Sequence, residues 1–215
     1  MDYRTFRDAG SSEVIEKKSR FIGEAVRVAS AAEAEAYIAG VRKHYYDARH
    51  HCFAFIAGEP GTPGEIRRSG DDGEPSGTAG RPILEILEGR SLHNVLIVVT
   101  RYFGGTLLGT GGLVRAYTQA VKEALANAPL VRMCPCIQYT LTMDYGSLDR
   151  VLFYLRQNGL EPGDQTYTDK VQLTVTVEES GADRFFKEIT ALSSGRIVPQ
   201  EAARGLLPVP VSGNS

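Results

Sequence analysis

The sequence predicts an α+β protein of two domains, and three observations support this. A continuous apolar run at residues 95–99 lies between segments with helical periodicity. The second half of the chain has its own alternation of strands and helices, and a proline between two cysteines at 134–136 separates the halves. With 215 residues, 42% of them hydrophobic, each half can bury a core. We expect domains at 1–133 and 134–205 and a flexible tail at 206–215.

The first half begins with two predicted strands, 12–17 and 20–28, which are broken near Lys17 and Lys18. Ser30 and Glu33 have the spacing of a capping box, and apolar residues at helical spacing then predict a helix over 31–44. Residues 51–57 are apolar enough for a buried strand. The first domain therefore opens with a strand pair, a helix and a third strand.

Residues 58–79 show no periodicity, and we expect a loop that is either functional or disordered. Pro82 suits the first turn of a short helix over 82–88. The run at 95–99 has no polar alternation, which predicts a strand covered on both faces. A long amphipathic helix follows over 111–128, with Thr110 as its expected N-cap.

In the second half, we expect 134–136 to be a short linker. Alternating residues 138–143 predict a strand, and a helix after it ends at Asn158 and Gly159. A weak strand at 160–167, a clear one at 171–177, a helix around 185–192 and a last strand from Ile197 complete the order β-α-β-β-α-β. That order is the ferredoxin-like arrangement.

The bulk composition limits the possible functions. The formal net charge is −2, and acidic and basic residues balance in both halves, so nucleic-acid binding would need a local patch. Three cysteines suit a reducing compartment, and the charged start lacks the apolar core of a signal peptide. No apolar run is long enough to span a bilayer. We expect a cytoplasmic protein without a membrane segment.

The strongest local chemistry lies in the glycine-rich loop (residues 103–112), between the buried strand and the long helix. Unpaired amides at a helix N-terminus attract anions, and glycine lets an anion approach the backbone. Arg101 and Arg115 flank the loop and could add forked hydrogen bonds to a phosphate. The predicted anion-binding residues are Arg101, Gly104, Gly105, Gly109, Thr110, Gly111, Gly112 and Arg115, with Lys18 and Arg20 as a nearby basic extension. The alternative is that the glycines only form a tight crossing from strand to helix.

The acidic loop (residues 71–80) carries Asp71, Asp72 and Glu74 within four positions. These carboxylates could place a metal, act in acid–base chemistry, or contact donors of the glycine-rich loop; a solvated acidic turn is the alternative. His50, with these three acids, is a possible polar partner of the site. The spacing of His50, Cys52, Cys134 and Cys136 does not fit a structural zinc site, so we assign no metal, no cofactor and no catalytic residue.

Three motifs resemble the YigZ/IMPACT family, in the form of its bacterial two-domain members. They are the segment 18–23, the acidic loop, and the stretch from Val99 through the glycine-rich loop to Tyr117. Matching motif positions in this chain are Lys18, Arg20, His50, Cys52, Asp71, Asp72, Glu74, Arg101, Gly104, Gly105 and Arg115. The resemblance implies a first domain like domain two of a small-subunit ribosomal protein, a fold shared with a domain of elongation factor G and with small-molecule kinases. It also implies a second domain like another domain of elongation factor G.

Three functions remain open at this point. The resemblance favours a translation-related regulator that binds RNA, the ribosome or a translation factor through the basic glycine-rich loop. An enzyme acting on a phosphorylated or nucleotide ligand is the second possibility, although the sequence shows no nucleophile with its base. The third is a docking adaptor that uses the exposed sheet of residues 138–200. We expect binding rather than catalysis, and the sequence gives no oligomeric state.

Overall fold

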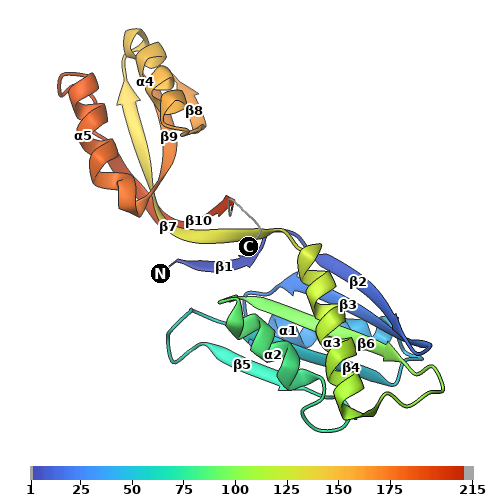
Figure 1. Ribbon diagram of the computed structural model, residues 1–215. Helices are drawn as coiled ribbons and strands as arrows, with labels where there is room; N and C mark the ends of the chain where they lie inside the picture. The colour runs from blue at the N-terminus through green and yellow to red at the C-terminus, as the bar shows by residue number, and fades with distance from the viewer. Residues whose placement is uncertain (1, 211–215) are drawn as a thin grey trace. The chain divides into compact units, whose positions relative to one another are not determined.

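The computed structural model describes residues 2–210. The chain divides between Arg132 and Met133 into two compact units, here called the first unit and the second unit. The first unit contains nine elements, which are six strands and three helices (Figure 1). They are β1 (Tyr3–Phe6), β2 (Gly10–Glu16), β3 (Ser19–Arg27), α1 (Ala31–His44), β4 (His50–Ala57), β5 (Ile66–Gly70), α2 (Gly80–Gly89), β6 (Val95–Tyr102) and α3 (Gly109–Ala126).

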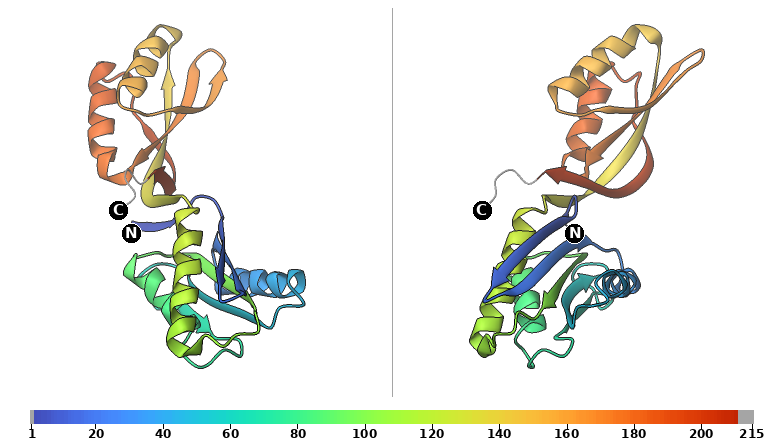
Figure 2. Two further views of the ribbon diagram at one scale, coloured as in Figure 1. Left: turned by 45° about the vertical axis from the view of Figure 1, so that its right-hand side comes forward. Right: turned by 90° about the vertical axis from the view of Figure 1, so that its right-hand side faces the viewer.

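The sheet of the first unit has the strand order β2-β3-β6-β4-β5, and all its neighbours are antiparallel. The central strand β6 is buried on both faces, as its unbroken apolar pattern predicted. Val95, Ile97 and Val99 pack with α2 and α3 on one face, and Leu96 and Val98 pack with α1 on the other (Figures 1 and 2). The first unit is thus a three-layer structure with one core on each side of the sheet.

Local sequence explains how several of these elements begin and end. Lys17 and Lys18 form the turn between β2 and β3, with φ of 45° and 67°, which two-residue hairpin turns of this kind require. The predicted capping box starts α1: the Ser30 side chain accepts from the Glu33 amide, and the Glu33 carboxylate accepts from the Ala29 amide. The helix bounds at 31 and 44 are as predicted.

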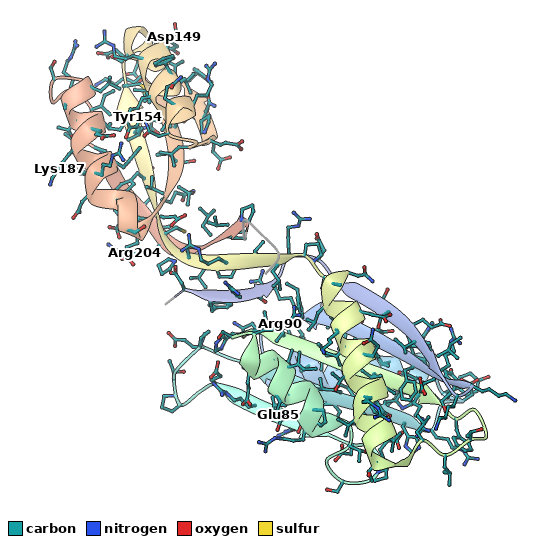
Figure 3. All side chains as sticks on the ribbon, in the orientation of Figure 1. Glu85, Arg90, Asp149, Tyr154, Lys187 and Arg204 are labelled. Carbon is teal, nitrogen blue, oxygen red and sulfur yellow. The ribbon has the colours of Figure 1, made fainter. Side chains whose placement is uncertain are left out.

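The second unit contains most of β7 (Leu130–Met143), then α4 (Tyr145–Gln157), β8 (Pro162–Tyr167), β9 (Val171–Glu178), a short 3-10 turn (Glu179–Gly181), α5 (Ala182–Leu192) and β10 (Gln200–Pro210). The predicted order β-α-β-β-α-β is observed, and the strands of this unit pair with one another in the order β10-β7-β9-β8. Both helices contribute to one core on one face of this sheet. They are linked by the Tyr154 hydroxyl of α4, which donates to Glu188 of α5 at 2.7 Å (Figure 3).

Four sequence predictions were wrong. Residues 134–136 are not a linker but part of the continuous strand β7. The segment 58–79 is not structureless, because Ile66–Gly70 forms β5 at the edge of the sheet. The last strand begins at Gln200 and includes residues 206–210 of the expected tail, whereas 211–215 lie outside the described residues. The long helix starts at Gly109, two residues earlier than predicted.

Among residues 2–210, no helix has both the length and the apolar character needed to cross a lipid bilayer.

Candidate functional site

One end of the first unit's sheet brings the predicted site residues together. Arg101, near the end of β6, pairs with Phe21 of β3 on one side and with His50 of β4 on the other. The glycine-rich loop follows β6 at this end and leads into α3. The acidic loop reaches the same place, because its Glu74 carboxylate contacts Arg101. Residues distant in the sequence therefore meet where three strands, two loops and a helix start converge.

A pocket of about 410 Å³ lies at this junction. Its polar lining comes from two arginines, a histidine, a glutamate and the first turn of α3, namely Arg49, His50, Glu74, Arg101, Gly109 and Thr110. Its apolar lining comes from Pro75, Phe103, Leu107, Leu108 and Leu113. A concave site of this size with a few polar groups in an apolar wall is typical of ligand pockets.

Arg101 is the central polar residue of the pocket. It is only 5% exposed, and its Nη1 donates to Glu74 Oε1 at 2.6 Å. Its guanidinium carbon lies 5.4 Å from the ring centre of Phe21 and 5.6 Å from that of Phe103. Among the described residues, its Nε is a buried polar atom without a hydrogen-bond partner. Such an unmet donor is costly, and native proteins leave few of them without a functional reason.

The same Glu74 oxygen also accepts from the Tyr117 hydroxyl of α3 at 2.8 Å. Glu74 thus connects the acidic loop to both β6 and α3 in the interior, where its side chain is 3% exposed. From the sequence alone, it is open whether the acidic carboxylates contact donors of the glycine-rich loop. For Glu74 the structure shows such a contact with Arg101, immediately before that loop.

The other two carboxylates of the acidic loop serve the loop itself. Asp71 accepts from the amides of Gly77, Ala79 and Gly80, at 2.8 to 3.0 Å, and so caps the start of α2. Asp72, which has a φ of 43°, accepts from Arg42 and from the His51 amide. Neither lines the pocket, and both have their oxygens occupied by the protein.

The start of α3 differs from the prediction. Thr110 is not the N-cap: that position is Leu108, and no side chain within residues 2–210 caps the helix. The first-turn amides that lack intrahelical partners therefore belong to Gly109, Thr110 and Gly111 rather than to residues 111–113. Gly109 and Thr110 line the pocket, so the uncapped helix end faces the site that contains Arg101.

Several other predicted residues lie outside the pocket. Arg115 is exposed and does not line it, so the expected pairing of Arg101 with Arg115 around one anion is not observed. Arg20 forms an exposed ion pair with Glu13 at 2.8 Å. Lys18 is exposed in the hairpin turn, and its backbone lies so close to Gly104 that a Cβ there would be 2.0 Å from the Lys18 carbonyl carbon. Gly105 has a φ of 83°, a conformation that suits glycine. Gly111 and Gly112 do not line the pocket.

Comparison with known proteins identifies the family. Residues 17–125 match the family model described as the Impact N-terminal domain. The chain belongs to the IMPACT family. Residues 141–196 match a second model, the domain of unknown function DUF1949.

The relatives in the IMPACT family align along most of the chain. The IMPACT family member YvyE of Bacillus subtilis strain 168 is 39% identical over 195 residues, covering 90% of this chain and 88% of that protein. The IMPACT family member YigZ of Escherichia coli K12 is 38% identical over 181 residues, covering 84% and 88%. A crystal structure of a hypothetical protein is 34% identical, with a TM-score of 0.60, and covers 94% of this chain and 98% of that one. The two-domain translational regulator Yih1 is less similar, at 24% identity and a TM-score of 0.40.

Cys52, a motif position of this IMPACT-family chain, is buried below the acidic loop. Its sulfur lies 3.0 Å from the Asp71 carbonyl oxygen and 3.2 Å from the Tyr117 hydroxyl. Burial raises the pKa of the Cys52 thiol to about 12, and burial also raises the pKa of Tyr117. A thiol that stays protonated is a poor nucleophile and a poor metal ligand. Among residues 2–210, no three His, Cys, Asp or Glu side chains gather as a metal site would require.

Sequence reasoning missed Arg49, Phe103, Leu107 and Tyr117 as residues of the site. Tyr117 lies on the buried face of the helix, but helical periodicity does not show which residue its hydroxyl contacts. Leu107 is 84% exposed. The signal that could have indicated it was a leucine in a glycine-rich loop where no pattern predicts its burial.

Proposed function

We propose that this chain is a binding module in the regulation of translation, which holds an anionic group of RNA, of the ribosome or of a translation factor. The binding site is the pocket at the start of α3. The observation that carries the proposal is Arg101, a buried guanidinium in the pocket wall beside the N-terminus of α3. Within the residues that the structure describes, its Nε has no partner and the helix start has no side-chain cap. The link to translation rests on the family resemblance and on the fold analogy it implies.

The fold analogy extends to both units. We propose that the first unit is like domain two of a small-subunit ribosomal protein and that the second unit is ferredoxin-like. The sheet order β10-β7-β9-β8, with both helices on one face, supports the second of these assignments. On this view the two domains correspond to residues 1–133 and to a second domain from residue 134.

Binding is favoured over catalysis by how the reactive groups are held. An enzyme on a phosphorylated ligand would need a carboxylate base or a metal site in the pocket. Asp71 and Asp72 are held by backbone amides and by Arg42, and Glu74 is held by Arg101 and Tyr117. The Cys52 thiol is kept protonated by burial. These groups stabilise the site and support a role in recognition.

Salt-dependent cosedimentation with ribosomes tests the proposal, with purified RNA and translation factors as parallel probes. Arg49 lines the pocket, is exposed and forms no ion pair within residues 2–210, so reversing its charge leaves the fold intact. We expect Arg49→Glu to weaken binding about tenfold at about 50 mM salt, where the electrostatic contribution is large.

Arg115→Glu is the matched control, because Arg115 is also an exposed, unpaired arginine of the first unit but lies outside the pocket. It should bind like the wild type. If the wild-type chain binds neither ribosomes, RNA nor translation factors at low salt, the proposed function is wrong.

A further inference from the structure

The pocket has two chemically different sides. Its inner side carries the polar groups around Arg101, whereas its outer side is formed by large apolar side chains from the glycine-rich loop. Leu107 is 84% exposed and Phe103 is 46% exposed, so both present apolar surface at the rim. Exposed leucine and phenylalanine beside a pocket mark a place where another molecule buries apolar surface. A bare inorganic anion would not cover the apolar surface on this side of the pocket.

The charges of the lining limit the kind of anion. Arg49 and Arg101 are its two cationic side chains, and Glu74 offsets one of them. One unpaired arginine and the start of one helix match a single carboxylate or phosphate group. A nucleic-acid strand is held by several lysines and arginines that follow its backbone, and the pocket lining does not provide such a row.

We propose that the pocket binds a peptide segment of a protein partner in which a large apolar side chain stands beside a carboxylate. This inference rests on the proposed function, and among its three partner classes it selects a protein. The apolar side chain lies against Phe103, Leu107 and Leu113. The carboxylate lies at the inner side, where it accepts from the first-turn amides of α3 and from Arg49.

Arg101 has a defined part in this arrangement. Its guanidinium carbon lies 5.4 Å from the ring centre of Phe21 and 5.6 Å from that of Phe103, and its Nε donor is buried without a partner in the described part of the chain. Phe103 belongs to the loop, lines the pocket and is half-exposed. A bound side chain that packs on Phe103 can shift this ring and open Nε to the carboxylate, which would remove the cost of an unsatisfied buried donor. An aromatic ring and a buried arginine are also the residue types that dominate binding energy at protein interfaces.

The test is an array of heptapeptides in which Phe, Leu or Trp stands beside Asp or Glu, probed with the full chain. Matched arrays carry Asn or Gln in place of the acid, or Ser in place of the apolar residue, and a poly(U) oligonucleotide is the nucleic-acid probe. We expect the acidic–apolar peptides to bind and both matched arrays to bind about tenfold more weakly or not at all.

Leu107→Ser and Ile15→Ser are the paired variants. Both leucine and isoleucine are exposed, at 84% and 68%, so neither change should unfold the chain, but only Leu107 lines the pocket. We expect Leu107→Ser to lower the affinity for the peptides about tenfold and Ile15→Ser to leave it unchanged.

The possible outcomes distinguish a failure of this inference from a failure of the proposed function on which it rests. If poly(U) binds, no peptide does, and Leu107→Ser has no effect on the RNA, the inference is overturned while the proposed function stands. Equal binding of acidic and neutral peptides overturns the role of the carboxylate and hence the inference. If peptides, poly(U) and ribosomes all fail to bind, both the inference and the proposed function are wrong.

Discussion

The acidic loop and the glycine-rich loop are alike in sequence but opposite in structure. Both are rich in glycine and both end at a helix start. In the acidic loop, Asp71 accepts from three amides of its own segment and caps α2. In the glycine-rich loop, no side chain of the described residues caps α3, and the first-turn amides face a pocket. The acidic loop satisfies its own amide donors, whereas the first-turn donors of α3 face the pocket.

The difference shows what decides whether the amides of a glycine-rich turn are satisfied within the turn or face a pocket. Glycine supplies the permissive backbone in both loops, so it does not distinguish them. The deciding residue is the nearby acid: an aspartate eight or nine positions before the helix occupies the donors of the acidic loop, and the glycine-rich loop contains no acid at all. Glu74 then fixes the acidic loop to the wall of the pocket that the other loop forms.

The largest expected effect comes from removing the acid that joins the two regions. Glu74→Ala leaves the buried Arg101 guanidinium without a counterion, and we expect the free energy of unfolding to fall by about 3–5 kcal/mol. Urea denaturation measures this change. Asp47→Ala, which removes a carboxylate that contacts Tyr102 at the surface, is a control that should cost less than about 1 kcal/mol. A loss below about 1 kcal/mol for Glu74→Ala would mean that the ion pair does not join the loops as described.

An intermediate effect comes from a matched pair of glycines at the two helix starts. A Cβ at Gly80 would lie 2.8 Å from backbone atoms of Gly70, whereas a Cβ at Gly111 meets nothing within 4 Å. We therefore expect Gly80→Ala to destabilise the chain by about 1–3 kcal/mol. Gly111→Ala should stabilise it by about 0.5 kcal/mol, because alanine loses less backbone entropy in a helix. Thermal and urea denaturation measure both, and equal effects at the two positions would refute the contrast between a closed and an open loop.

The smallest expected effect is a pH dependence from the thiol beneath the acidic loop. The folded-state pKa of Cys52 is about 12, above its ordinary value, so the folded protein keeps the proton while the unfolded chain begins to release it. Stability from this group is complete below the unfolded pKa near 9 and falls as the pH rises toward 12. We expect a loss of about 1 kcal/mol between about pH 9 and 10.

Cys52→Ser, which keeps a hydroxyl donor that does not titrate in this range, should lose less stability over the same pH interval. Urea titrations of both proteins under reducing conditions give the comparison. Parallel stability curves would show that the thiol is not buried as the structure has it.

The sequence predicted most of the first unit because its elements are defined locally. The capping box at Ser30, the unbroken apolar run of β6 and the helical face of α3 each contain their own signal. The strand β5 was missed because Ile66–Gly70 has no alternation; it is a strand by virtue of pairing with β4 at the sheet edge. Residues 206–210 of β10 were predicted as part of the tail, because the residues of this strand are mostly exposed and give no buried pattern.

The candidate site was predicted in part. The glycine-rich loop and Arg101 were recognised, because glycines between a buried strand and a helix suggest a helix N-terminus that is open to a ligand. The ion pair between Arg101 and Glu74 joins residues 27 positions apart and was left open, because spacing alone does not show which donor a carboxylate meets. Arg115 was predicted in the pocket for its place near the loop, but α3 begins at Gly109 and the pocket takes Thr110 and Leu113 from it, not Arg115. Because the helix starts two residues earlier than predicted, Arg115 lies about 3 Å further along the helix axis from the first turn than expected.

The position of β6 has a consequence for how the chain is made. This strand lies between β3 and β4, yet it follows both of them in the sequence, and it supplies buried side chains to both cores of the first unit. A growing polypeptide that ends before Val95 contains β3 and β4 without the strand that pairs with both. The core against which α1 packs then lacks Leu96 and Val98. The sheet of the first unit can therefore close only after the central strand β6 has been synthesised, and α3, whose first turn lines the pocket, follows that strand in the chain.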